Sequence, residues 1–248
     1  MIVVISVAFT LSVFSFISMA TPASNTPCTL VPYSASYKIY RGKTVVGHVE
    51  RDLRLTDPAK QLWQATMDSE AGILFYKITS HEQSVFKLSN AQVQPIHHQL
   101  REKRTFKHEN NTVQDFNWQT MQEQGHKNER HWQRSFIEHS LDSLNYVEQL
   151  SIHLCQQQLK NHQYTVNDEG QDTPYYMMYQ GEQTITTPLG ALDTYLFTRI
   201  RKSNTRETQI WFAKKYHFTP VKIRQTKDGK EQANMLINQL TLHDKVND

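Results

Sequence analysis

An alternation of apolar and polar residues with a period of two constrains the fold of this chain of 248 residues more than any other feature. Between residues 33 and 39, apolar side chains occupy the odd positions and polar side chains the even ones. After Arg41-Gly42-Lys43, the odd positions largely resume the pattern over residues 45–55. Successive side chains of a strand point to opposite faces, so the pattern predicts a hairpin of half-buried strands.

Further short strands are expected along the rest of the chain, separated by residues that favour turns. They are predicted at residues 63–67, 73–78, 84–88, 97–108, 112–118, 175–180, 183–187, 191–201, 207–212, 221–226 and 231–243. Asn110-Asn111 and Asp228-Gly229 are expected at hairpin turns, the second of type I′. Such strands predict a mainly β fold, an antiparallel β-roll or partly closed barrel.

One segment departs from the strand rhythm and predicts an amphipathic helix at about residues 140–160. Its apolar residues recur at spacings of three and four: Leu141, Leu144, Val147, Leu150 and Leu154. Ser140 or Asp142 is available as its N-cap. The predicted organisation is a signal peptide at residues 1–20, an extended segment at 21–32, one β-rich domain at 33–243, and a tail at 244–248.

The first twenty residues are typical of an export signal, because residues 2–19 are nearly all apolar and carry no charge. Ser18-Met19-Ala20 fits signal peptidase, so the mature chain is expected to begin at Thr21, in the periplasm and without an integral span. The alternative is an uncleaved anchor, since no Lys or Arg precedes the run. Five Ser and Thr residues interrupt it, and its length is at the short end of the roughly 17 to 25 residues that span a bilayer.

Two cysteines are present, Cys28 and Cys155. In an oxidising compartment they can form a disulfide that ties the mature N-terminus to the predicted helix. The alternative is a pair of buried thiols, because a sequence does not show whether two Cα atoms come within bridging distance.

The C-terminal third contains Ile210-Trp211-Phe212-Ala213, then residues 216–223, then Lys227-Asp228-Gly229. This pattern resembles the bacterial family known as domain of unknown function 3108. The same resemblance extends to residues 33–37 and Gly47, to Asp142-Ser143-Leu144, and to residues 184–194. The resemblance covers most of the chain after the signal. It implies an exported, β-rich periplasmic protein, and its motifs specify no chemistry.

Catalytic, metal and cofactor motifs are absent from the sequence, so no catalytic residue, metal site or cofactor is predicted. His97 and His98 would point to opposite faces of a strand, and no H-E-x-x-H, C-x-x-C or G-x-S-x-G occurs. The formal charge of +3 is spread along the chain, which gives nucleic-acid binding little support.

Four aromatic residues at strand positions are candidates for a ligand pocket, since a rolled sheet with one helix often encloses an apolar cavity. Tyr37, Trp63, Phe197 and Trp211 are expected to point inward and line it. The alternative is that these side chains, Trp211 above all, only fill the core.

A basic cluster consists of Arg101, Lys103, Arg104 and Lys107, beside Leu100 and Phe106. It has two interpretations. The first is an exposed or edge strand protected from aggregation by its charge. The second is a basic rim that meets anionic lipid headgroups or acidic polysaccharide at a pocket mouth.

The predicted function is a non-enzymatic envelope protein that binds an apolar or amphipathic ligand, such as a lipid, or another envelope protein, on the concave face of the sheet. One alternative is a cell-envelope hydrolase whose site is assembled from dispersed residues. The other is a structural or assembly factor. Convergent His and carboxylate groups in one cleft would favour the enzyme, and an apolar cavity the binder.

Overall fold

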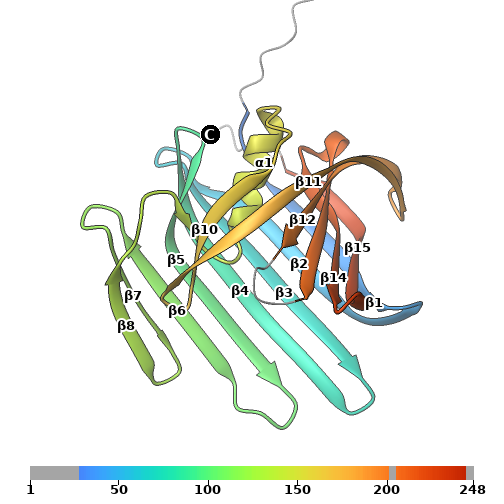
Figure 1. The fold of residues 1–248 in the computed structure, drawn as a ribbon, viewed down its shortest axis with the longest axis horizontal. Coiled ribbons are helices and arrows are strands. Elements are labelled where there is room, and N and C mark those ends of the chain that lie inside the picture. The colour runs from blue at the N-terminus through green and yellow to red at the C-terminus, as the bar shows by residue number, and fades with distance from the viewer. Residues whose placement is uncertain (1–27, 201–204, 244–248) are drawn as a thin grey trace, which may run out of the picture.

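The computed structural model describes residues 28–200 and 205–243, which form one sheet of 15 strands, one α-helix and a short 3₁₀ helix, Lys214–Tyr216 (Figure 1). The strands of the first half are β1 (Tyr33–Arg41), β2 (Thr44–Asp57), β3 (Leu62–Ile73), β4 (Tyr76–Ser89), β5 (Gln92–Arg104), β6 (Asn110–Asn117), β7 (Gln122–Lys127) and β8 (Arg130–Ser135). Those of the second half are β9 (Ser140–Leu141), β10 (His162–Asp168), β11 (Gln171–Thr187), β12 (Gly190–Ile200), β13 (Arg206–Ala213), β14 (Thr219–Lys227) and β15 (Lys230–Leu242).

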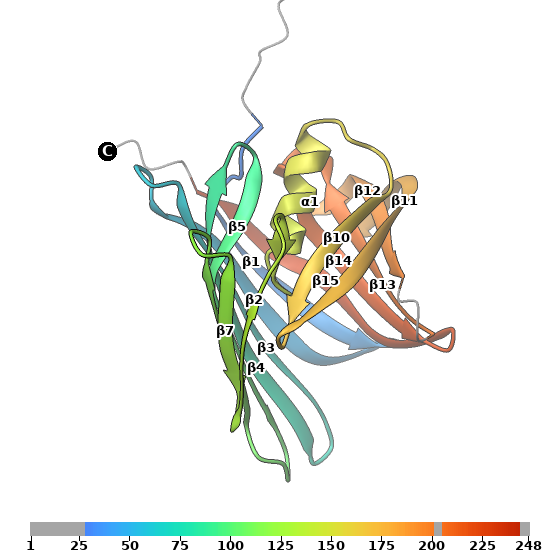
Figure 2. The same cartoon turned by 60° about the vertical axis from the view of Figure 1, so that its left-hand side comes forward.

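The sheet runs in the order β8-β7-β6-β5-β4-β3-β2-β1-β15-β14-β13-β12-β11-β10-β9. Neighbouring strands are antiparallel except β9 and β10, which are parallel. β1 pairs with both β2 and β15 and so joins the two halves. The sheet rolls around the helix α1 (Tyr146–Cys155) without closing into a complete barrel (Figures 1 and 2). The predicted β-roll or partly closed barrel is confirmed.

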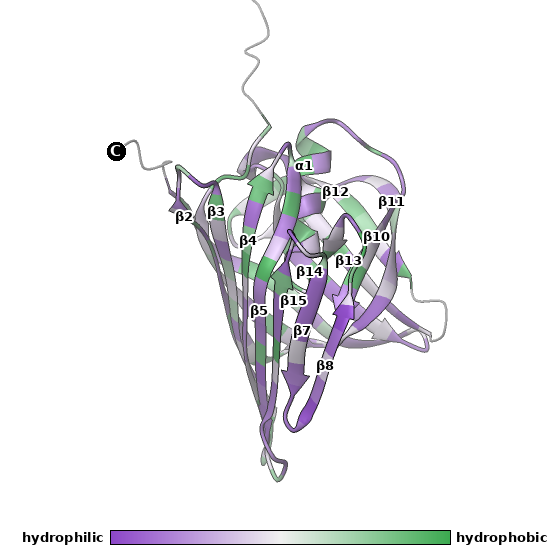
Figure 3. Cartoon of the chain, turned by 90° about the vertical axis from the view of Figure 1, so that its left-hand side faces the viewer, coloured by the Kyte–Doolittle hydropathy of each residue, from purple (hydrophilic) through white to green (hydrophobic). Residues whose placement is uncertain are grey.

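The inner face of the sheet carries the apolar residues of the period-two pattern, and α1 packs against it. Tyr33, Ala35 and Tyr37 of β1 are buried, as are Leu150 and Leu154 of α1. Figure 3 shows the same alternation as bands of apolar and polar residues along the strands. The period-two pattern therefore identified the buried side of these strands correctly.

The helix is shorter than the predicted span of residues 140–160. Ser140 and Leu141 pair with β10 as a strand, and Gln157 adopts a positive φ of 59° just beyond the helix. Neither Ser140 nor Asp142 is the N-cap, because the helix begins after Asn145. The Asn145 side chain makes no capping hydrogen bond. The Asp142 carboxylate instead accepts the backbone N–H groups of Leu144 and Asn145, which forms a tight turn before the helix.

Two predicted strands contain hairpin turns, so those predictions are wrong in part. Leu74 and Phe75, within predicted strand 73–78, connect β3 to β4, and Phe106 lies in the β5–β6 turn. The predicted Asn110-Asn111 turn is instead the start of β6. Apolar turn residues carry none of the Gly or Asn signals from which turns are inferred. The Asp228-Gly229 turn is confirmed, and both residues have the positive φ of type I′ (52° and 71°).

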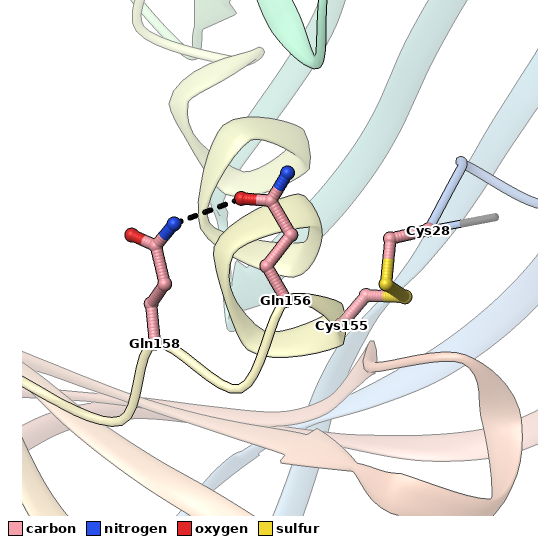
Figure 4. Close-up of a disulfide and its surroundings, with 4 residues drawn as sticks. All are labelled: Cys28, Cys155, Gln156 and Gln158. Carbon is pink, nitrogen blue, oxygen red and sulfur yellow. Dashed lines mark hydrogen bonds between the residues drawn. A yellow bond between two sulfur atoms is a disulfide. The ribbon is translucent and has the colours of Figure 1, made fainter. Parts of the chain in front are cut away.

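Cys28 and Cys155 form a disulfide, with their Cα atoms 5.5 Å apart (Figure 4). The bond joins the segment before β1 to the last residue of α1. Of the two arrangements that the sequence left open, the structure therefore has the disulfide.

The two halves of the sheet also meet through side chains where the strand ladder is interrupted. Glu169, between β10 and β11, accepts hydrogen bonds from Lys127 Nζ (2.5 Å) and Arg130 Nη2 (3.4 Å) of the β7–β8 hairpin. Arg134 of β8 pairs with Asp172 of β11. We call this group of ion pairs the seam.

No helix in the described part of the chain has the length and apolar character needed to cross a bilayer. The predicted signal peptide and C-terminal tail lie outside the described residues, as does most of the predicted extended segment.

Candidate functional site

The predicted pocket residues do not all share one face of the sheet. The strand register places Tyr37, Trp63 and Phe197 on the inner face, where each is at most 1% exposed. Cross-strand partners share a face and successive residues alternate. Phe197 faces Ile210, whereas Trp211 faces Leu196, so Trp211 lies on the outer face and its predicted inward orientation is wrong. A ligand contact by the other three stays a prediction.

Trp211 is nevertheless well covered, with 5% of its surface exposed. Its indole N–H donates to Gln183 Oε1 at 2.9 Å, and the Lys222 ammonium lies 4.5 Å from the ring centroid. These contacts agree with a role in packing strands β11 to β14 together.

Polar side chains inside the roll were missed by the sequence analysis. Arg51 and Glu148 form an ion pair of 2.6 Å between β2 and α1, and each side chain is 2% exposed. Arg51 Nε also donates to the Tyr33 hydroxyl at 2.8 Å. The available signal was that Arg51 occupies an odd position of the alternating run, where an apolar residue is expected. A buried ion pair of this kind fixes the placement of α1 on the sheet.

A second group, the buried polar cluster, consists of Glu82, His98, Gln114, Glu123 and Asn167. His98 Nε2 lies 2.9 Å from Glu82 Oε1, and Nδ1 lies 3.1 Å from Gln114 Oε1. Gln114 Nε2 donates to Glu123 at 3.0 Å and to Asn167 at 3.1 Å. The cluster therefore connects β4, β5, β6 and β7 to β10 across the interior.

His98 is the basic member of this cluster. Burial alone would lower the pKa of His98, but the hydrogen bond to Glu82 and the carboxylates of Asp142 and Glu82 outweigh burial and raise it to about 9. The pKa of Glu82 is lowered, because the hydrogen bond and charge of His98 and the Ser143 hydroxyl outweigh the opposing effect of burial. Both imidazole nitrogens face oxygen acceptors, which is the environment that a doubly protonated ring requires.

Ser143 brings a hydroxyl to the same place, so the group resembles a hydrolase site in composition. Its Oγ donates to Glu82 Oε1 at 2.6 Å and lies 3.1 Å from His98 Nε2. In a nucleophile–base–acid relay the carboxylate binds one imidazole nitrogen and leaves the other for the hydroxyl. Here Ser143 and Glu82 share one nitrogen and His98 already holds its proton. The geometry therefore favours a structural link between the sheet and the turn before α1.

Apolar side chains are exposed at the opposite end of the molecule. The β3–β4, β5–β6 and β7–β8 turns form what we call the hairpin end, at the lower edge of Figures 1 and 2 and remote from α1. Leu74, Phe75 and Phe106 project there with 94%, 87% and 92% of their surfaces exposed. Leu74 and Phe106 also have positive φ values of 53° and 63°, a conformation that costs an L-residue about 1 to 2 kcal/mol. Core packing explains neither feature.

The β3–β4 and β5–β6 turns are joined to each other. The Thr105 backbone N–H donates to the Lys77 carbonyl at 2.9 Å, and the Lys77 N–H donates to Thr105 Oγ1 at 2.9 Å. Leu74 and Phe75 therefore lie on one of two adjacent turns that are hydrogen-bonded to each other through Lys77 and Thr105, and Phe106 lies on the other.

A groove of about 380 Å³ lies where β4, β5 and the β5–β6 turn meet, and its lining includes Lys77, Lys103, Arg104, Lys107 and Phe106. We call it the basic groove. Lys77 pairs with Glu70 at 2.8 Å and Arg104 with Glu102 at 2.7 Å. Lys103 and Lys107 form no ion pair within the described ranges. The groove therefore keeps an excess of positive charge.

The predicted basic rim is brought together in part. Lys103, Arg104 and Lys107 line the basic groove, whereas Arg101 lines an adjoining polar groove of about 410 Å³. The two grooves share Lys103 and Thr79, and the lining of the polar groove includes the carboxylates Glu50, Asp68, Glu70 and Glu109. β5 is not an edge strand, because it pairs with β4 and, over residues 97–102, with β6. Arg101, Lys103 and Lys107 are exposed, so the interpretation as an exposed, charge-protected segment stays open. Among the described residues, no three His, Cys, Asp or Glu side chains converge in a way that could hold a metal ion.

Comparison with known proteins gives a family and a fold. A family model described as "Protein of unknown function (DUF3108)" matches residues 33–236. The crystal structure of a β-barrel-like protein of domain of unknown function DUF1849 from Brucella abortus is similar, with a TM-score of 0.62 and 8% identity over 87% of this chain and 99% of that one.

A "putative lipoprotein" from Parabacteroides distasonis matches with a TM-score of 0.32 and 8% identity, over 86% of this chain and 96% of its own. A search of curated proteins found no match. The Brucella similarity concerns the fold alone.

Proposed function

The chain belongs to the DUF3108 family of proteins of unknown function, and from this premise we propose that it is an exported, non-enzymatic envelope protein that binds an anionic amphipathic molecule at the basic groove. The proposal rests on one observation above all. A groove with unpaired Lys103 and Lys107 lies beside Phe106, whose side chain is 92% exposed. Export to the periplasm rests on the predicted signal peptide.

Anionic chemistry follows from the charges that line the groove. Lysine ammonium groups bind phosphate or carboxylate as point charges, and the Arg104 guanidinium can add directed hydrogen bonds. The carboxylates of Glu70 and Glu102 already pair with Lys77 and Arg104. A headgroup anion would therefore meet Lys103 and Lys107 first.

The amphipathic part follows from the apolar turns beside the groove. A ligand with an acyl chain can cover Phe106 while its headgroup stays among the cations. The concave face is a weaker candidate, because Tyr37, Trp63 and Phe197 are at most 1% exposed and α1 packs on that face. We accordingly place the site at the hairpin end.

The test is calorimetric titration with short-chain phosphatidylglycerol and phosphatidylcholine below their micelle concentrations. We expect the anionic lipid to bind more tightly. The double substitution Lys103→Glu with Lys107→Glu should weaken it by a factor of about ten or more, since each cation near an anionic group contributes about 1 kcal/mol.

The matched control is Lys38→Glu with Lys87→Glu, which makes the same charge change at exposed positions outside the groove. Its binding should stay close to that of the unmodified protein. An acidic oligosaccharide without acyl chains serves as a third ligand. Equal affinity for this sugar would make the groove a general polyanion site, and equal losses in both double variants would contradict the proposed place of binding.

A further inference from the structure

We infer that the hairpin end docks on the surface of an anionic lipid bilayer, with Leu74, Phe75 and Phe106 inserted among the acyl chains and the basic groove at headgroup level. This inference rests on the proposed function and names its partner, a membrane surface rather than a single carried molecule. The proposed function requires only that a lipid bind at the basic groove. The inference adds that the β3–β4 and β5–β6 turns enter the bilayer.

The first observation is the composition of the β3–β4 turn. Ile73-Leu74-Phe75-Tyr76 is a run of four apolar residues at a hairpin tip, where Gly, Asn and Asp usually occur. Isolated exposed apolar residues are ordinary on protein surfaces. Here Leu74 and Phe75 are joined by Phe106 of the neighbouring turn, and all three are at least 87% exposed. Such a group marks an interaction surface.

The second observation is where the turns lie in the molecule. They form the lower tips of the long hairpins in Figures 1 and 3, whereas α1, whose last residue carries the disulfide, lies at the other end. The direct hydrogen bonds between Thr105 and Lys77 keep the two tips together. The tips can therefore contact a flat surface without any change in the packing of the core.

The third observation is the order of charge along each turn. Lys77 follows Phe75 by two residues, and Arg104 and Lys107 flank Phe106. When the apolar tips enter the acyl region, these cations come to the level of the headgroups, which their long side chains can reach. Tyr76, which is 41% exposed, would lie at the same boundary. A second copy of the chain is the poorer occupant, because it would bring two basic grooves together.

The experiment measures sedimentation of the exported protein with vesicles of phosphatidylcholine alone and with one quarter phosphatidylglycerol. The tip variant carries Leu74→Ser, Phe75→Ser and Phe106→Ser. We expect it to lose about tenfold or more of its partition into anionic vesicles, because interfacial binding scales with buried apolar area. The control is Ile137→Ser, at an apolar residue that is 53% exposed outside the hairpin end. It should bind vesicles like the unmodified protein.

A second readout reports the tip directly. Phe75→Trp and Ile137→Trp are compared in vesicles with brominated acyl chains, against the background of the native tryptophans. Additional quenching in Phe75→Trp alone supports insertion, and this signal is independent of any vesicle binding by residues 1–20. Equal quenching in the two variants overturns the inference.

The outcomes also separate this inference from the proposed function. If a variant with Leu74→Ser and Phe75→Ser alone binds both vesicles and short-chain phosphatidylglycerol like the unmodified protein, insertion is refuted while the proposed function, which uses Phe106, stands. If the unmodified protein binds no short-chain anionic lipid, the proposed function fails. A tip variant that changes only the oligomeric state in light scattering would identify a second copy as the occupant and overturn the membrane assignment.

Discussion

At the scale of single residues, the most unusual feature is the number of polar side chains inside a rolled sheet. Arg51, Glu82, His98, Glu123 and Glu148 are each at most 8% exposed. Unpaired, such groups would cost several kcal/mol each. They are tolerated because each has partners: Glu148 binds Arg51, Glu82 binds His98, and Glu123 accepts from Gln114. Sheet and helix are therefore joined by specific polar contacts as well as by apolar packing.

His98 gives the first residue-scale prediction, a loss of stability in mild alkali. The folded protein raises the pKa of His98 from 6.5 to about 9, so between these values the folded state holds a proton that the unfolded state has released. The stabilisation is fully present below pH 6.5 and is lost as the pH rises through about 9. Burial lowers the pKa of His153 from 6.5 to about 4, so His153 changes the stability only below pH 6.5, outside the range in which His98 does.

The measurement is urea denaturation between pH 6.5 and 9, for the unmodified protein and for His98→Gln. The variant should be less stable at pH 6.5 and should lose most of the pH dependence across the window. A matched substitution at the more exposed His81, His81→Gln, should keep the slope. An unmodified protein with equal stability at both ends of the range would disprove the assigned role of His98.

At the scale of elements, the disulfide and the Asp142 turn hold the two ends of α1. Asp142 accepts backbone N–H groups before the helix and also receives the Ser84 hydroxyl of β4 at 2.6 Å. Cys155 at the other end is bonded to Cys28. A ten-residue helix is too short to be stable by itself. These attachments and its buried face account for its presence.

Removal of the disulfide should destabilise the fold without changing its topology. The bond spans a sequence separation of 127 residues, and closing so long a loop in the unfolded chain is worth roughly 5 kcal/mol in the chain-entropy account. The double substitution Cys28→Ser with Cys155→Ser should lower the unfolding free energy by about that amount in guanidinium denaturation.

The reduced, unmodified protein serves as the control and should match the double variant. A variant as stable as the oxidised protein would show that the bond adds nothing to the fold, and the sheet contacts of α1 alone would then explain its position.

At the scale of the whole molecule, the roll has one junction that the strand ladder does not bridge. There the β7–β8 hairpin meets the β10–β11 hairpin through side chains. β8 ends the strand ladder, and these side chains form the ion pairs of the seam. The side chain of Trp132 also packs against Gly170, where an added Cβ would lie 2.8 Å from the ring. Partly exposed ion pairs are each worth up to about 1 kcal/mol and are weakened by salt.

The seam should therefore open before the rest of the sheet. Glu169→Gln with Asp172→Asn should raise amide hydrogen exchange in β7 and β8 by about tenfold, since roughly 1 to 2 kcal/mol of local stability would be lost. Exchange in β2 and β3 should not change. High salt should reproduce the effect in the unmodified protein. Uniform acceleration over the whole sheet would instead mean that the seam supports global stability.

Features that depend on neighbours along the chain could be predicted from the residues alone. The alternation in β1 and β2 reports which side of each strand is buried, and the Asp228-Gly229 pair sets its turn through local backbone preferences. The helix and the cysteine pair also leave local signals, the apolar stripe and two lone thiols in a chain with an export signal.

Only the tertiary structure decided which distant residues share a face, a cluster or an end of the molecule. The inward orientation assigned to Trp211 failed because residues 194–199 of the neighbouring strand are all buried, which removes the alternation that would distinguish the two faces. Arg51 and Glu148 lie 97 positions apart, and their pairing follows from the seating of α1 on the sheet. The hairpin end likewise arises because antiparallel strands return alternate turns to one edge, which places the turn of Phe75 next to the turn of Phe106. Contacts of this kind depend on the register of the strands and on how the sheet rolls. Many long-range contacts together set both, so neither can be recognised from the periodicity of the sequence.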